Sequence, residues 1–163
     1  MARGLRPAAL LLALVAGPAA AQEAVPEVDY LLVRKAQRVL DAYSEGHLVR
    51  RIEGIQLGDA PAGPKRFEGD ERTPEGRYII DFGNPDSAYH LSLHISYPSD
   101  ADLRLASAQG RSAGGAIFIH GQPNGHPGRA EGDWTDGCIA VSNDEIEWLW
   151  QAVPDGVTIE ILS

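Results

Sequence analysis

Short segments of β-branched and aromatic residues, each bounded by glycine, proline, asparagine or aspartate, recur along the sequence and limit its possible folds more than any other feature. Such punctuation is typical of β-strands. Between residues 58 and 76, glycine and proline are too dense for a regular element, so this segment is expected to be a loop. The sequence therefore predicts a mainly β domain. The expected strands are two short ones within 30–43 and others at 47–57, 77–82, 90–97, 116–120 and 157–161.

Two short helices are expected among these strands. Ser142 and Glu145 have the spacing of a capping box, and the apolar residues that follow them recur at helical intervals. A second helix is predicted over 99–109, with a serine at its start as a candidate cap and with Leu103 and Leu105 as its apolar residues.

The first residues predict a signal peptide. Arg3 and Arg6 precede an apolar run, 8–16, that is too short to span a bilayer, and small residues precede the expected cleavage site after Ala21. The remaining chain is long enough for one domain with its own core. We therefore expect an exported protein with no integral membrane segment after cleavage. The expected parts are a signal peptide (1–21), a linker (22–29) and one domain (30–163).

The formal charge of the chain is −9 at pH 7, and removal of the two arginines of the signal peptide makes it more acidic still. A surface this acidic repels polyphosphate and anionic lipid. We therefore expect no nucleic-acid partner, whereas neutral and zwitterionic substrates are compatible with this charge.

The candidate chemistry lies within 116–141. A predicted strand ends in His120-Gly121, a glycine-rich loop follows, and a second short strand begins at Cys138, the single cysteine. Because an unperturbed thiol has a pKa of about 8.5, a nucleophilic cysteine requires an adjacent base, and His120 is the candidate. Gly137 leaves room for close substrate approach, and backbone N–H groups in this region are candidate donors to an oxyanion.

This segment closely resembles the active-site signature of the L,D-transpeptidase catalytic domain, the YkuD-like family. The family signature reads histidine, a spacer of about this length, serine or threonine, histidine, glycine and cysteine. The resemblance covers roughly 30–162 and is more specific than a lone short motif. Four further segments are similar to the branch described as YafK-like murein transpeptidases: 63–65, 68–70, 72–78 and 90–98.

The resemblance implies a mainly β, sandwich-like fold of two curved sheets with one or two short helices. It also implies a two-step reaction in the periplasm on peptidoglycan stem peptides. Cys138 attacks the amide between diaminopimelate and D-alanine, and the resulting thioester is resolved by an amine or by water. His120 is the implied general base, and the Gly121 carbonyl orients it. No metal or cofactor is implied, and a wall-tethered lipoprotein is a candidate partner.

Two positions depart from the family pattern, and both lie in the expected substrate-binding region with Trp134 and Thr135. Asp136 stands where most members have histidine, and it opposes formation of the thiolate unless it faces away or pairs with a cation such as Arg129. Ala140 stands where many members have arginine or asparagine, so a candidate carboxylate-binding side chain is missing.

Three other functions fit parts of this pattern. The same two residues serve an L,D-peptidase or amidase if water resolves the thioester. A second alternative is a non-catalytic module that keeps the fold and only binds peptidoglycan. A zinc hydrolase requires His126 to join His120 and Cys138, but no regular ligand spacing supports it.

Overall fold

The computed structural model describes residues 24–163, so the expected signal peptide over 1–21 lies outside the described residues. The packed domain begins slightly before residue 30, the expected start. Val28 is fully buried, and its N–H donates to the carbonyl of Ala152 at 2.7 Å. Within residues 24–163, no helix is long and apolar enough to cross a bilayer.

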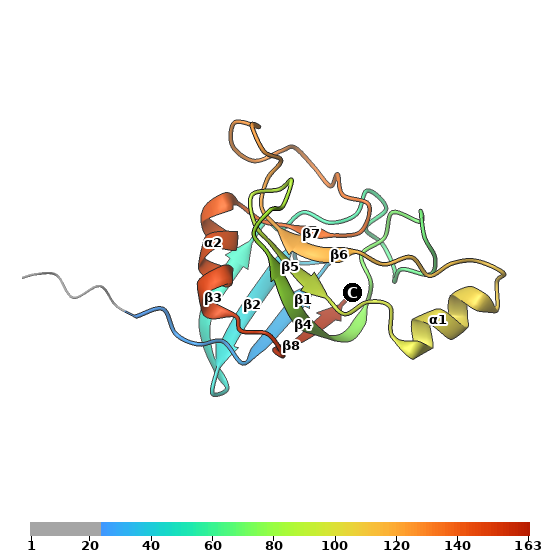
Figure 1. Ribbon diagram of the computed structural model, residues 1–163, viewed down its shortest axis with the longest axis horizontal. Helices are drawn as coiled ribbons and strands as arrows, with labels where there is room; N and C mark the ends of the chain where they lie inside the picture. The colour runs from blue at the N-terminus through green and yellow to red at the C-terminus, as the bar shows by residue number, and fades with distance from the viewer. Residues whose placement is uncertain (1–23) are drawn as a thin grey trace, which may run out of the picture.

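Eight strands form one continuous curled sheet, and all the expected strands are among them (Figure 1). They are β1 (Tyr30–Arg34), β2 (Val39–Ser44), β3 (His47–Glu53), β4 (Gly76–Asn84), β5 (Ser92–Ile95), β6 (Ile117–His120), β7 (Ile139–Ala140) and β8 (Thr158–Leu162). Their order across the sheet is β3-β2-β1-β8-β4-β5-β6-β7. The β1–β8 and β6–β7 pairs are parallel, and the other neighbouring pairs are antiparallel.

β4 belongs to both halves of this sheet. Its first part, 76–79, pairs with β8, and its second part, 80–84, pairs with β5 across a shift of register. A bulge of this kind bends a strand and increases its twist. The expected mainly β fold of two curved sheets with short helices is confirmed, and the two sheets are joined through the strand that they share.

β5 is shorter than the segment 90–97 that the sequence predicted. His90 has a positive φ of 69°, and its N–H donates to the Asn124 side chain at 2.9 Å instead of to a neighbouring strand. The extended ladder therefore begins only at Ser92. The side chains that alternate with the cleft-facing residues of β5 and β6 are buried in the core, as Leu93 and Ile119 show.

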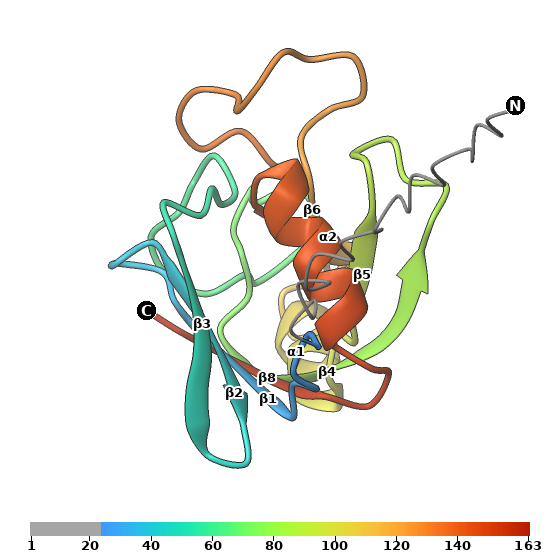
Figure 2. The ribbon, with the colours of Figure 1, turned by 90° about the vertical axis from the view of Figure 1, so that its left-hand side faces the viewer.

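The helix α2 (Asn143–Ala152) packs against β5 and β6 and covers one side of the core (Figure 2). Its predicted capping box is present. The Ser142 hydroxyl accepts from the Glu145 N–H at 3.2 Å, and the Glu145 carboxylate accepts from the Ser142 N–H at 2.7 Å. Ile146 and Leu149 are fully buried, so this amphipathic helix contributes its apolar face to the core.

The predicted helix over 99–109 is also present, as α1 (Asp100–Ser107), with Ser99 as its cap. The expectation that Leu103 and Leu105 form the core-facing side of this helix was wrong, however. Leu103 and Leu105 are 49% and 46% exposed, and Ala106 is the buried residue of this helix. Positions two apart on an α-helix point about 200° from each other, so the two leucines cannot face one core together.

Candidate functional site

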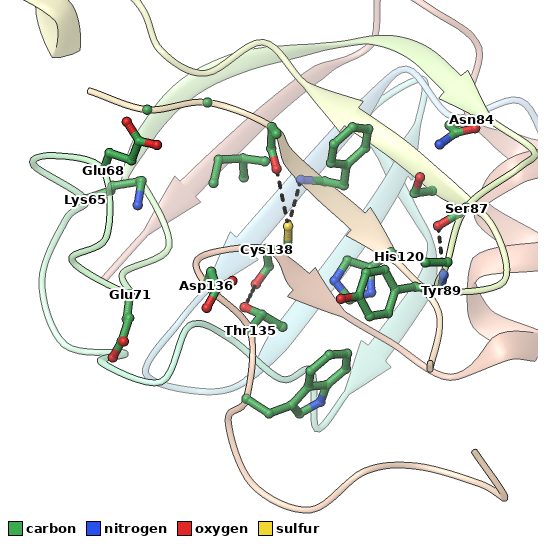
Figure 3. Close-up of a pocket in the computed structure, with 18 of the residues that line it drawn as sticks. Lys65, Glu68, Glu71, Asn84, Ser87, Tyr89, His120, Thr135, Asp136 and Cys138 are labelled. Atoms are coloured by element: carbon green, nitrogen blue, oxygen red, sulfur yellow. Dashed lines mark hydrogen bonds between the residues drawn. The ribbon is translucent and has the colours of Figure 1, made fainter. Parts of the chain in front are cut away.

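A cleft of about 720 Å³ lies over the face formed by β4, β5 and β6 (Figure 3). Two loops border it, one within 65–71 and one within 134–138. His120 and Cys138, the two residues that the sequence analysis singled out, both line this cleft. Two consecutive strands, β6 and β7, therefore bring the candidate nucleophile and base into one site.

The register between β6 and β7 explains this placement. These strands are parallel neighbours, with Ile119 beside Ile139 and His120 beside Ala140. In the same register Cys138 lies beside Phe118, whose N–H points at the thiol sulfur at 3.4 Å. Because residues two apart on a strand face the same side, the side chains of Cys138 and His120 emerge from one face of the sheet.

The surroundings of Cys138 favour the neutral thiol over the thiolate. Its Sγ donates to the carbonyl of Ala116 at 3.6 Å. Burial raises the pKa of the Cys138 thiol above its ordinary value, and the nearby Asp136 carboxylate adds to the increase. The Phe118 N–H and the charge of Lys65 act in the opposite direction, but burial is the largest effect. A thiolate therefore forms only when a base takes the proton.

His120 is the candidate for that base, and its own surroundings are well defined. Its side chain is almost completely buried, and Nδ1 lies 2.7 Å from the carbonyl oxygen of Gly121. A carbonyl can only accept, so Nδ1 carries the hydrogen and Nε2 has a free lone pair. Burial lowers the pKa of His120 despite this hydrogen bond, so the imidazole is neutral near pH 7.

The Gly121 backbone is itself fixed. Its N–H donates to the carbonyl of Tyr89 at 3.0 Å, and a side chain at this position would meet the Asn143 Oδ1 at 2.7 Å and Tyr89 O at 2.9 Å. The carbonyl that holds the His120 ring can therefore approach it only because the residue is a glycine.

Two aromatic side chains enclose the imidazole. The Tyr89 ring stacks on His120 with centroids 4.5 Å apart, and the Trp134 ring lies 5.5 Å away at a steeper angle. Trp134, an expected substrate-binding residue, lines the cleft, and its Nε1 is buried with no partner among the described residues. Sequence reasoning missed Tyr89 because a single aromatic residue in a loop carries no local signal of its role.

Thr135 supports the turn that presents Cys138. Its hydroxyl donates to the Cys138 carbonyl at 2.8 Å and accepts from the Gly137 N–H at 3.2 Å. Thr73, which sequence reasoning did not identify, brings a second hydroxyl to the same carbonyl at 3.5 Å. The side chain of Thr135 was expected to bind substrate, but both of its contacts are with the backbone of this turn.

Gly137 adopts a φ of +131°, a conformation that residues with a side chain rarely occupy. A Cβ at this position would lie 2.6 Å from the carbonyl oxygen of Arg72. The turn therefore requires glycine, both for its backbone angle and for its close contact with the loop beside it. Since the Gly137 N–H is already used by Thr135, the N–H of Cys138 is the candidate donor to an oxyanion.

Asp136 is exposed at the edge of the cleft. Arg129, the cation named as a possible partner for this carboxylate, does not pair with it. Arg129 instead binds the Glu145 carboxylate at 2.7 Å and the Gly54 carbonyl at 2.6 Å. The Asp136 charge therefore acts on Cys138 without neutralisation by Arg129.

The zinc alternative finds no geometric support. His126 does not line the cleft, and its Nδ1 lies 3.3 Å from the carbonyl of Gly128. Among residues 24–163, no three histidine, cysteine or carboxylate side chains come together as a metal site. The third ligand that a zinc hydrolase requires is therefore not near His120 and Cys138.

The two ends of the cleft differ in charge. Lys65, Glu68 and Glu71 lie on one side of Cys138, whereas Asn84 and Ser87 lie on the other, beyond His120 (Figure 3). Lys65 is nearly buried and paired with Asp70 at 2.9 Å, so its charge is largely compensated. One end of the cleft is therefore acidic and the other is polar without formal charge.

Comparisons with known proteins agree with this arrangement. The family model of the L,D-transpeptidase catalytic domain matches residues 28–161. The Escherichia coli protein YafK, named as a candidate L,D-transpeptidase, is 30% identical over 134 residues, which cover 76% of this chain and 46% of that protein. The chain thus spans about half the length of the curated relatives it matches.

Solved structures of other proteins share this fold. The helical cell shape determining protein Pgp2 of Campylobacter jejuni superposes with a TM-score of 0.64 at 26% identity, over 86% of this chain and 51% of that one. An L,D-transpeptidase of Xylanimonas cellulosilytica gives a TM-score of 0.53 at 17% identity, over 83% of this chain and 61% of that one. The second likeness concerns the fold alone.

Proposed function

This chain belongs to the family of L,D-transpeptidase catalytic domains, and we propose that it is an exported cysteine acyltransferase acting on peptidoglycan stem peptides in the periplasm. Membership of this family supports a peptidoglycan-modifying function. One observation carries the finer proposal: Cys138 and His120 emerge from the same face of two neighbouring strands into one cleft. A thiol beside a neutral imidazole is a nucleophile with its base.

In the first step, Cys138 Sγ attacks the carbonyl carbon of the amide between diaminopimelate and D-alanine. His120 Nε2 takes the thiol proton and then gives it to the nitrogen of the departing D-alanine, so that the C–N bond breaks as the thioester forms. The Cys138 N–H donates to the oxyanion of the tetrahedral intermediate. The Gly121 carbonyl stabilises the imidazolium that exists between the two transfers.

In the second step, an amine of another stem peptide attacks the thioester. His120 Nε2 takes a proton from this amine, and Sγ leaves as the new amide forms and recovers a proton from the imidazolium. Glu68, Glu71 and Asp136 border the cleft, and their negative charge raises the local concentration of the acceptor as its ammonium cation. The ammonium loses one proton to solvent to become the neutral amine that attacks. This charge favours an amine over water as acceptor and therefore favours transpeptidation over hydrolysis.

The test is an incubation of the protein with a disaccharide tetrapeptide donor and a stem-peptide amine as acceptor. We expect release of D-alanine, a cross-linked product, and a mass increase on the protein equal to the donor minus D-alanine. Cys138→Ala, which removes only the sulfur, is the control and should show none of these. Products that are only free acids would assign hydrolysis, and binding without any release of D-alanine would assign a non-catalytic module.

A further inference from the structure

Three polar residues form a row across the uncharged end of the cleft. Asn84 pairs with Ser92 in the register between β4 and β5, and Ser92 pairs with His120 between β5 and β6. Directly opposed residues of antiparallel strands point to the same face. All three residues line the cleft, so Asn84 and Ser92 continue the surface that His120 begins.

Ser92 has no structural partner that explains its hydroxyl. The residue is only 4% exposed, and its Oγ makes no hydrogen bond with any residue of the described chain, 24–163. The Oγ atom itself keeps contact with solvent in the cleft, so water can satisfy it in the free protein. A molecule bound in the cleft can take the place of that water and accept a hydrogen bond from the hydroxyl.

Asn84 completes a donor pair. Its Oδ1 accepts from the Asp86 N–H at 3.0 Å, which fixes the orientation of the carboxamide and leaves Nδ2 without a partner among residues 24–163. The Asn84 Nδ2 group can only donate, and the neighbouring Ser92 hydroxyl can also donate. Together they favour a ligand that places an oxygen acceptor between them. Lys65, the lysine of the cleft, lies at the other end and is paired with Asp70. An anionic oxygen would thus be desolvated here without a compensating cation.

We propose that Asn84 and Ser92 form a subsite that binds an uncharged amide carbonyl of the donor stem peptide beside His120. This inference rests on the proposed function and adds a substrate-positioning site to it. The subsite orients the peptide so that its scissile amide meets Cys138. It contributes to binding through two hydrogen bonds that the free protein lacks, and neither residue takes part in proton transfer.

The test measures the Kd of a disaccharide tetrapeptide by calorimetry in a Cys138→Ala background, where no turnover occurs. Adding Ser92→Ala or Asn84→Ala should raise the Kd by about five- to tenfold each, the effect of one lost hydrogen bond. Ser107→Ala on the exposed α1 is the matched control and should leave the Kd unchanged. Ser92→Ala should also leave the thermal midpoint and the alkylation rate of an intact Cys138 unchanged, which separates substrate binding from a structural role.

Asn84→Asp distinguishes the chemistry of the bound group. It keeps the Oδ1 acceptor but replaces the donors with a second acceptor and a charge, so an amide carbonyl should bind more weakly still. Tighter binding to this variant would show that the subsite receives a cation or a donor and would overturn the proposal. An unchanged Kd in Ser92→Ala and Asn84→Ala would overturn the subsite and leave the proposed function intact, whereas no binding by Cys138→Ala would overturn both.

Discussion

The Tyr89 ring lies stacked on the imidazole of His120, with their centroids 4.5 Å apart and their planes inclined by 28°. Tyr89 itself is 38% exposed, so its ring stands between the base and solvent. The burial that lowers the pKa of His120 therefore depends in part on this one side chain. The rate and the pH profile of the reaction should both respond to it.

Replacing Tyr89 by alanine should lower kcat/KM by about three- to tenfold, since a stacked aromatic pair contributes roughly 0.5–1.5 kcal/mol. It should also move the acid limb of the pH profile upward, because exposure to water returns the His120 pKa toward its ordinary value. Tyr89→Phe keeps the ring and should preserve both properties. The measurement is D-alanine release between pH 4 and pH 9, and an acid limb that does not move in Tyr89→Ala would contradict this role.

The resting protonation state gives a second prediction. Because the pKa of Cys138 is raised and that of His120 is lowered, the pair is neutral and not a preformed thiolate and imidazolium. The rate of alkylation by iodoacetamide should therefore keep rising with pH beyond about 8.5, the ordinary thiol pKa. His120→Gln should abolish turnover yet change this alkylation profile little. A plateau reached below pH 7 in the wild type would show the opposite, a thiolate stabilised at rest.

The local parts of the fold could be predicted from the sequence because their signals lie within a few residues. Ser142 and Glu145 marked the start of α2 by their spacing, and the alternation of 157–161 marked β8. The strand order could not be predicted in this way. β4 pairs with β8 in one sheet and with β5 in the other, across a shift of register, and both partners are distant in the sequence or set by tertiary packing. The exposure of Leu103 was likewise set by where α1 lies and not by its own sequence.

The candidate site divides in the same way. His120 and Cys138 were identified by a chemically specific spacing, and the structure brings both to one cleft. Tyr89, Ser92 and Lys65 were missed because each reaches the cleft through tertiary packing and follows no local pattern.

Asp136 should retard the thiol chemistry. Burial is the main cause of the raised pKa of Cys138, and the Asp136 carboxylate adds to it through its charge. Asp136→Asn should therefore increase the alkylation rate at pH 8 by about two- to fivefold, and the difference should shrink in high salt because exposed charges are screened. Glu131→Gln removes an exposed carboxylate from the same loop outside the cleft and should have no effect. Equal rates for Asp136→Asn and wild type at low salt would show that this charge does not reach the sulfur.

Substitutions of Thr135 can distinguish two roles of its hydroxyl, namely fixing the position of Cys138 and binding the substrate. Its hydroxyl bridges the Cys138 carbonyl and the Gly137 N–H, so Thr135→Val leaves two backbone groups without this partner at nearly constant volume. The free energy of unfolding should fall by about 1–3 kcal/mol. Turnover should fall at least tenfold through kcat, because a misplaced nucleophile slows the chemical step more than binding. Thr135→Ser keeps the hydroxyl and should restore most of both losses. Urea unfolding and steady-state kinetics measure the two effects, and a variant that raised KM alone at unchanged stability would instead assign the Thr135 hydroxyl to the substrate.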